Sequence, residues 1–223
     1  MSPERYAKIL HVLKHRQPDL TVVVDQVHKP HNISAIIRTC DAVGVGHVHA
    51  VWPEDDALFR VLRRQAKGAE RWVEVHHHNR IQDVGADLKG RGFTLVAAHL
   101  SDRAVPYRDV DWTQPIALIM GQEREGMTEE AAELADVHAI IPMLGMVESY
   151  NVSVAAAIML AEAQRQRQAK GMYDAPRLPR EEYEALRFRW VHPLIARYCD
   201  EHGKPYPPLD EQGELLDRHS WRQ

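Results

Sequence analysis

Runs of β-branched and other apolar residues alternate along this chain with segments of helical spacing. The strand-like runs, all between residues 20 and 143, are LTVVV, HVHAVW, WVEVHH, FTLVAAHL, PIALIM and HAIIPM. Segments such as ISAIIRTCDAV, IQDVGADLKG and TEEAAELA, which are typical of helices, separate most of them. Continuous apolar strands separated by helices are typical of a parallel sheet covered on both faces. The pattern therefore predicts an α/β fold.

Helices are also predicted toward both ends of the chain. Residues 2–16 fit a helix that has Ser2 as its N-cap and Pro3 at its first position. A long helix is expected over residues 152–170, and another over residues 180–201 after the proline-rich segment DAPRLPR. We therefore expect an N-terminal helical extension (1–19), a central domain (20–170) and a C-terminal helical extension with a tail (171–223).

The composition indicates a soluble globular protein, because 44% of its 223 residues are hydrophobic and 27% are charged. Cys40 and Cys199 are far apart and neither belongs to a CxxC pair, which argues against a disulfide framework or a zinc knuckle. The chain contains no apolar run of about 18 residues, and its first residues lack the apolar core of a signal peptide. We therefore expect a cytoplasmic protein that does not enter a membrane.

Charge is distributed unevenly, although the formal net charge is only −4. Residues 1–16 contain four basic residues and one acidic residue, and residues 164–180 contain five and one. Residues 101–136 contain nine acidic residues and three arginines. Charged runs are often solvated helix faces. Basic segments that flank an acidic middle also fit an RNA held at one side of the protein.

The segment IIPMLGMVESYNVSVAAA, from Ile140 to Ala157, contains the densest group of polar candidates. A strand end, a turn at Gly145 and the polar side chains of Ser149 and Asn151 come directly before a predicted helix. Serine and asparagine are preferred N-cap residues, so the segment fits a capped helix start. It equally fits a ligand-binding edge.

Two further segments have the same organisation. In HKPHNISAIIRTCDAVG, Asn32 lies at a predicted helix entrance and Arg38 follows six residues later. In IALIMGQEREGM, an apolar strand ends at Gly121, and Glu123 follows two residues later. In this order the three segments resemble the signature motifs of the SPOUT methyltransferases, also called the SpoU/TrmH or α/β-knot class. The flanking segments RQPDLTVVVDQVHKPHN and EAQRQRQAKGMY resemble its members that methylate the ribose 2′-oxygen of guanosine 18 in tRNA.

This resemblance implies a deep trefoil knot near residues 116–157 and a cofactor, S-adenosylmethionine, bound in a bent form by backbone groups of the knotted loops. A GxGxxG motif after a strand is absent, which argues against an ordinary dinucleotide-binding fold. By position, the cofactor pocket of the family falls on Ala98, Leu100, Gly121, Ile141, Met146 and Tyr150. Glu148 and Tyr150 stand where the family commonly has glutamine and leucine. Which side chains line the pocket is therefore not decided by the resemblance.

The resemblance also assigns catalytic roles to Arg38, Asn32, Glu123, Ser149 and Asn151. Arginine is a poor base, and two roles for Arg38 therefore stay open. It acts either as a perturbed base or as a charge that stabilises the developing alkoxide and grips the adjacent phosphate. Asn32 is expected to cap its helix and to shape the catalytic site.

The family implies tRNA as a partner and a homodimer whose second subunit completes the site. The RNA-contacting candidates are Arg5, Lys8, Arg16, His31, Arg165 and Arg167. Arg165 and Arg167 are two apart and do not share a helix face, so at least one is expected to serve RNA while the other pairs locally. No metal is predicted, because consecutive residues of a strand point to opposite faces and His76, His77 and His78 cannot converge on one ion.

Three alternatives remain at this stage. The same chemistry on another tRNA position or on ribosomal RNA would use the same motifs. A noncatalytic RNA-binding module would keep the fold, although loss of Arg38 or of the third motif would then be expected. A nucleotide-dependent oxidoreductase on an ordinary doubly wound sheet is disfavoured by the missing glycine fingerprint.

Overall fold

The computed structural model describes residues 1–52, 71–122 and 126–217. The chain divides into two compact units, of which the larger comprises residues 17–172. The smaller unit combines residues 1–16 with residues 173–223, so both terminal segments belong to the same unit.

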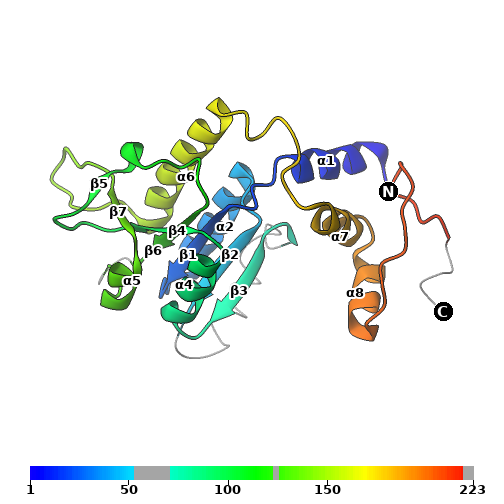
Figure 1. The fold of residues 1–223 in the computed structure, drawn as a ribbon, viewed down its shortest axis with the longest axis horizontal. Coiled ribbons are helices and arrows are strands. Elements are labelled where there is room, and N and C mark those ends of the chain that lie inside the picture. Colours follow the sequence, from blue (N-terminus) through cyan, green and yellow to red (C-terminus); the bar gives the residue numbers. More distant parts are fainter. Residues whose placement is uncertain (53–70, 123–125, 218–223) are drawn as a thin grey trace. The chain divides into compact units, whose positions relative to one another are not determined.

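A parallel sheet forms the centre of the larger unit (Figure 1). Its order is β3-β2-β1-β6-β4-β7-β5, and every strand pair within it is parallel. The strands are β1 (Leu20–Asp25), β2 (His47–Val51), β3 (Glu74–His78), β4 (Thr94–Ala98), β5 (Val105–Pro106), β6 (Ile116–Met120) and β7 (Val137–Ile140). The predicted α/β architecture is confirmed.

Helices cover both faces of this sheet (Figure 1). On one face, α2 (Pro30–Val43) and α6 (Val152–Ala169) bury their apolar residues in a core shared with Val22 and Val24 of β1. On the other face, α4 (Ile81–Gly90) and α5 (Glu129–Leu134) pack into a second core, shared with Val23. Adjacent residues of β1 enter different cores because successive strand side chains point to opposite faces.

The smaller unit is built around α1 (Pro3–Lys14) and α7 (Arg180–Val191), which are in contact. The predicted start of α1 is confirmed, because the Ser2 hydroxyl accepts a hydrogen bond from the Arg5 amide at 3.3 Å. The predicted helix over residues 180–201 is wrong in one respect. It is divided into α7 and α8 (Pro193–His202), since Pro193 offers no amide hydrogen and disfavours a helical residue before it.

Two short elements were absent from the sequence pattern, namely β5 and a 3-10 turn over Tyr107–Asp109. Two residues of strand are too few to produce an apolar alternation. Within the described residues, no helix combines the length and the apolar character needed to cross a membrane.

Candidate active site at the carboxyl edge of the sheet

The neighbouring strands β6, β4 and β7 end together at one edge of the sheet. Ala98 is the last residue of β4 and pairs in register with Ala139 of β7. Gly121 directly follows β6, and Ile141 directly follows β7. The carboxyl edge of a parallel sheet is the usual ligand site of α/β folds. The structure thus places three of the predicted cofactor residues at a suitable edge.

The turn after β6 requires glycine at position 121. A Cβ at Gly121 would lie 2.6 Å from the Met127 Cα and 2.7 Å from the Gly126 carbonyl oxygen. The returning chain is also held by a hydrogen bond from the Gln122 amide to the Gly126 carbonyl at 2.9 Å. Backbone therefore approaches backbone closely at this edge, which is the arrangement that cofactor binding through main-chain groups needs.

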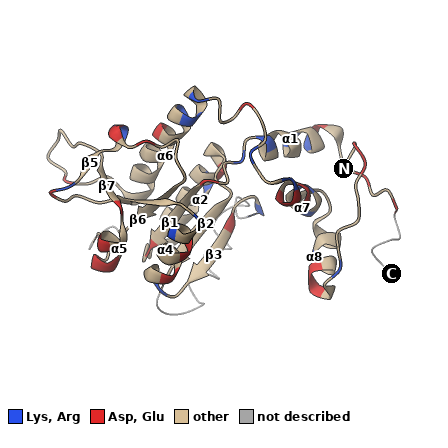
Figure 2. Cartoon of the chain, in the orientation of Figure 1, with Lys and Arg blue, Asp and Glu red and all other residues tan. Residues whose placement is uncertain are grey.

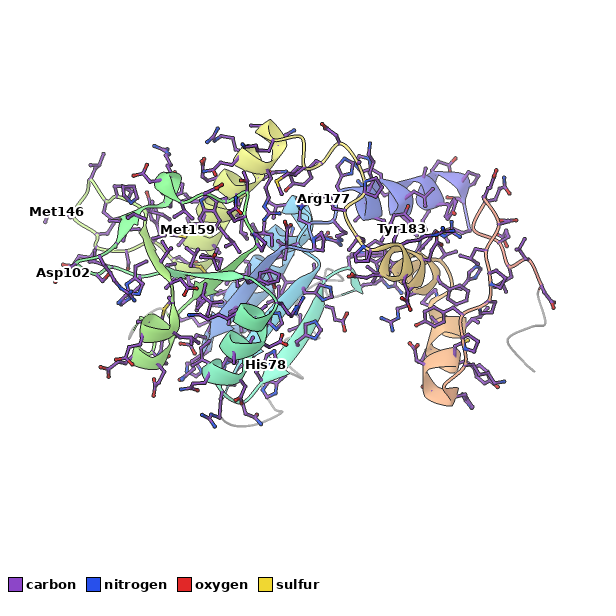
Figure 3. The ribbon with its side chains drawn as sticks, viewed as in Figure 1. His78, Asp102, Met146, Met159, Arg177 and Tyr183 are labelled. Carbon is purple, nitrogen blue, oxygen red and sulfur yellow. The ribbon has the colours of Figure 1, made fainter. Side chains whose placement is uncertain are left out.

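Three other cofactor candidates are exposed in the single chain. Met146 is fully exposed, at 100%, and Leu100 and Tyr150 are exposed as well. Figure 3 shows Met146 on the loop between β7 and α6, which projects at the left of the view. The structure therefore does not gather these three side chains around Ala98, Gly121 and Ile141.

Two asparagines connect the first and third motifs. Asn151 is the N-cap of α6, because its Oδ1 accepts hydrogen bonds from the Ser153 amide at 3.0 Å and the Ser153 hydroxyl at 2.6 Å. Its Nδ2 donates to Oδ1 of Asn32, at 3.3 Å. The capped helix start and the polar site are thus the same feature.

The predicted capping role of Asn32 is wrong. The N-cap of α2 is Lys29, and Pro30 is the first helical residue. Asn32 lies two residues further on, where it is buried and bonded to Asn151. Proline is favoured at the first helical position, and it sets the helix start earlier than the polar side chain indicated.

The remaining catalytic candidates differ in their surroundings. Arg38 is exposed on α2 and makes no ion pair within the described part of the chain. His31, proposed for RNA, is exposed in the first turn of the same helix. Ser149 is exposed in the loop before Asn151, and Glu123 lies outside the described residues. The guanidinium of Arg38 is therefore accessible to a substrate phosphate or ribose.

Asp25 is a buried charged residue that the sequence motifs did not single out. It ends β1, next to β6, and it accepts hydrogen bonds from the Thr128 amide at 3.2 Å and the Thr128 hydroxyl at 2.7 Å. Burial raises the pKa of Asp25 above its ordinary value. The contact ties the end of β1 to the start of α5, just after the Gly121 turn. An acidic residue that closes the apolar run LTVVV was the available signal.

Figure 2 shows basic residues on α1 and near the end of α6, and acidic residues on α5. Arg5 and Lys8 of α1 are exposed on the surface of the smaller unit. The Arg165 side chain is 67% exposed, and its guanidinium bonds both carboxylate oxygens of Glu162, at 2.9 and 2.7 Å. Arg5, Lys8 and Arg165 therefore stay available to a polyanion.

Arg167 and Arg16 are buried and are not available to a polyanion. Arg167 is 0% exposed, and its guanidinium bonds Asp19 Oδ1 at 2.6 Å, Gln17 Oε1 at 3.1 Å and the Trp112 carbonyl at 2.8 Å, among other acceptors. Arg16 is buried with its guanidinium 5.3 Å from the centre of the Trp190 ring. The prediction that these two arginines contact RNA is wrong, because neither side chain reaches the surface.

Comparison with known proteins assigns the chain to one family. The model of the SpoU rRNA methylase family matches residues 19–161, and that of the SpoU rRNA methylase C-terminal region matches residues 165–218. The chain is 51% identical to the tRNA (guanosine(18)-2′-O)-methyltransferase of Escherichia coli K12, over 99% of this chain and 96% of that protein.

Solved structures are similar as well. The crystal structure of the A. aeolicus TrmH/SpoU tRNA modifying enzyme superposes with a TM-score of 0.78 and 41% identity, over 84% of this chain and 94% of that one. The AdoMet-bound rRNA methyltransferase from Sinorhizobium meliloti gives a TM-score of 0.60 and 31% identity, over 67% and 60% of the two chains.

Proposed function

The chain belongs to the SpoU rRNA methylase family, and we propose that it methylates the ribose 2′-hydroxyl of guanosine 18 in tRNA with S-adenosylmethionine as the methyl donor. The observation that carries the proposal is the likeness, over nearly the whole chain, to an enzyme named for that reaction. Methylation of ribosomal RNA or of another tRNA position is the alternative, since the name of the family model refers to rRNA.

The carboxyl edge of β6, β4 and β7 suits the cofactor. S-adenosylmethionine supplies an electrophilic methyl group on a sulfonium. Main-chain groups at Ala98, Gly121 and Ile141 would hold its adenosyl part, because the glycine turn brings backbone donors and acceptors to this edge. Leu100, Met146 and Tyr150, which are exposed in the single chain, would complete the pocket. The trefoil knot that the resemblance implies for residues 116–157 stays a prediction.

Arg38 supplies positive charge at the reacting oxygen. Methyl transfer needs the 2′-oxygen in line with the methyl group, and negative charge builds on that oxygen as its proton leaves. An exposed guanidinium at this position stabilises this charge and binds the neighbouring phosphate. Asn32 and Asn151 fix the helix that carries it, and Ser149 and Glu123 orient the ribose. Arg38 thus acts as a charge rather than as a base.

In the smaller unit, Arg5 and Lys8 of α1 are exposed and available to tRNA. In the larger unit, His31 and Arg165 are exposed and available to it. A homodimer accounts for the exposed apolar side chains of the segment after β7, which a second subunit would cover: Leu144, Met146, Val147 and Tyr150. We expect the protein to act in the cytoplasm, where unmodified tRNA is available.

Site-resolved methylation assays test the proposal. Purified protein, S-adenosylmethionine and an unmodified tRNA transcript should give one 2′-O-methyl group, at guanosine 18. A transcript with 2′-deoxyguanosine at that position is the matched control and should accept none. Methylation elsewhere in the tRNA, or only of ribosomal RNA fragments supplied in parallel, would overturn the assignment of the substrate.

A further inference from the structure

Histidines and one glutamate form a ladder across β2 and the edge strand β3. In the parallel register His47 lies opposite Glu74, and His49 lies opposite His76. Residues two apart on a strand share a face, and paired residues on neighbouring strands do so too. These four side chains therefore project from the same face of the sheet, and His78 continues the row.

Three of these side chains bring ligand atoms together. Nδ1 of His47 lies 3.0 Å from Nε2 of His76 and 3.8 Å from Oε2 of Glu74. Their three ligand atoms all lie within 4.8 Å of one another. The His47 and Glu74 side chains are 33% and 53% exposed, so an ion can enter from solvent.

We propose that His47, Glu74 and His76 bind a divalent transition-metal ion, and that Zn²⁺ is the ion that this site fits best. Two imidazole nitrogens and one carboxylate oxygen are a usual zinc ligand set, with the fourth position left to water. Zn–N bonds of about 2.0–2.1 Å place two nitrogens of a tetrahedral site roughly 3.4 Å apart. The observed 3.0 Å requires a shift of only a few tenths of an ångström.

A second pair of histidines supports the ligands from within the sheet. Nδ1 of buried His49 lies 2.9 Å from Nε2 of His78, and the rings of His49 and His76 are stacked with their centroids 5.2 Å apart. Packing of this kind limits the rotation of the His76 ring. Rigid surroundings of a ligand contribute to metal affinity.

The ion would link β2 to β3. Within the described residues, β3 is the end strand of the sheet and pairs only with β2. One ligand comes from β2 and two come from β3. Binding therefore stabilises the pairing of an outer strand, in addition to its backbone hydrogen bonds.

His77 provides a matched control for the histidines of the site. It precedes His78 on β3 but points to the opposite face, where its ring stacks on Trp52 with the centroids 6.3 Å apart. Three consecutive histidines thus do not form a site by themselves, as the strand alternation predicted. The cluster arises from His76, from Glu74 two residues earlier on the same strand, and from His47, which the register with β2 adds.

Titration of untagged, chelator-treated full-length protein tests the proposal. Zn²⁺ is measured by calorimetry, and Co²⁺ is used as a probe because its visible spectrum reports tetrahedral coordination. We expect about one ion per chain. Glu74→Gln and His47→Gln should each weaken binding by at least about tenfold, because changing a residue that merely supports a metal ligand already has an effect of that size. His77→Gln should bind as the wild type does.

Hydrogen exchange provides a second measurement. Zn²⁺ should slow amide exchange in β3 of the wild type but not of Glu74→Gln. Because the Glu74 side chain is exposed, this variant should fold normally, and circular dichroism checks that it does. The proposal is overturned if the wild type binds no ion at micromolar concentrations. It is equally overturned if His77→Gln weakens binding as much as His47→Gln does, since the ion would then bind at scattered surface histidines.

Discussion

Asn151 donates a hydrogen bond from its side-chain amide to the side-chain oxygen of Asn32, which lies 3.3 Å away and 119 positions earlier in the chain. The same Asn151 side chain caps α6 through Ser153. The contact therefore fixes the start of α6 against the first turn of α2, the helix that also carries Arg38. We expect the position of Arg38 on α2 to depend on this junction.

Arg38→Ala should lower the single-turnover rate of methylation by about two orders of magnitude, the scale of one lost electrostatic contact in a transition state. Cofactor affinity and thermal stability should hardly change, because the side chain is exposed and makes no ion pair in the described residues. Arg80→Ala, at another exposed arginine, is the control. Equal rates for both variants under saturating cofactor would remove Arg38 from the mechanism.

Gly121→Ala should impair cofactor binding, because its new methyl group would meet the backbone of Gly126 and Met127 at less than 3 Å. Overpacking of this kind costs about 1–3 kcal/mol. Gly145→Ala is the matched variant, since no atom lies within 4 Å of its added Cβ. Calorimetry with S-adenosylmethionine should separate the two, and similar affinities would show that the turn adapts.

Arg167→Met should reduce the free energy of unfolding by about 3–5 kcal/mol, because it removes the buried guanidinium that bonds the Asp19 carboxylate at 2.6 Å. Arg165→Met removes only an exposed pair with Glu162 and should cost less than about 1 kcal/mol. Urea denaturation measures both. A small loss for Arg167→Met would mean that its network contributes little.

The double variant Arg5→Gln with Lys8→Gln should weaken tRNA binding several-fold. If each residue contacts one phosphate, the slope of log K against log salt should flatten by about 0.7–0.9 per contact. Arg197→Gln with Lys204→Gln removes the same charge elsewhere in the same unit and is the control. An unchanged slope in the first variant would exclude α1 from the RNA interface.

Asp25 should make stability depend on pH. Burial raises its pKa in the folded state, so the folded protein holds this proton more tightly than the unfolded chain does. The stability that protonated Asp25 contributes is thus complete below its unfolded pKa of about 4, and it is lost as pH rises through the folded pKa. The difference in unfolding free energy between the wild type and Asp25→Asn should therefore fall as the pH rises above about 4. A difference that rises with pH would contradict the assignment.

Several features were predictable because their causes are local. Apolar runs separated by helical segments predicted the parallel sheet, and Ser2 followed by Pro3 predicted the start of α1. Asn151 was foreseen as a helix cap for the same reason, since capping involves neighbours within three residues. The break at Pro193 was equally local, because a proline disfavours a helical residue before it, and the prediction of an unbroken helix did not take this into account.

The sequence by itself determined the alternation of strands and helices, the motifs and the family, because each depends on residues that are close together in the chain. Only the tertiary structure decided that Arg165 is exposed while Arg167 is buried. It also decided that Asn32 meets Asn151 and that His47 meets Glu74. These outcomes depend on strand register and helix packing between segments far apart in the chain, and a one-dimensional pattern of polar and apolar residues does not specify either.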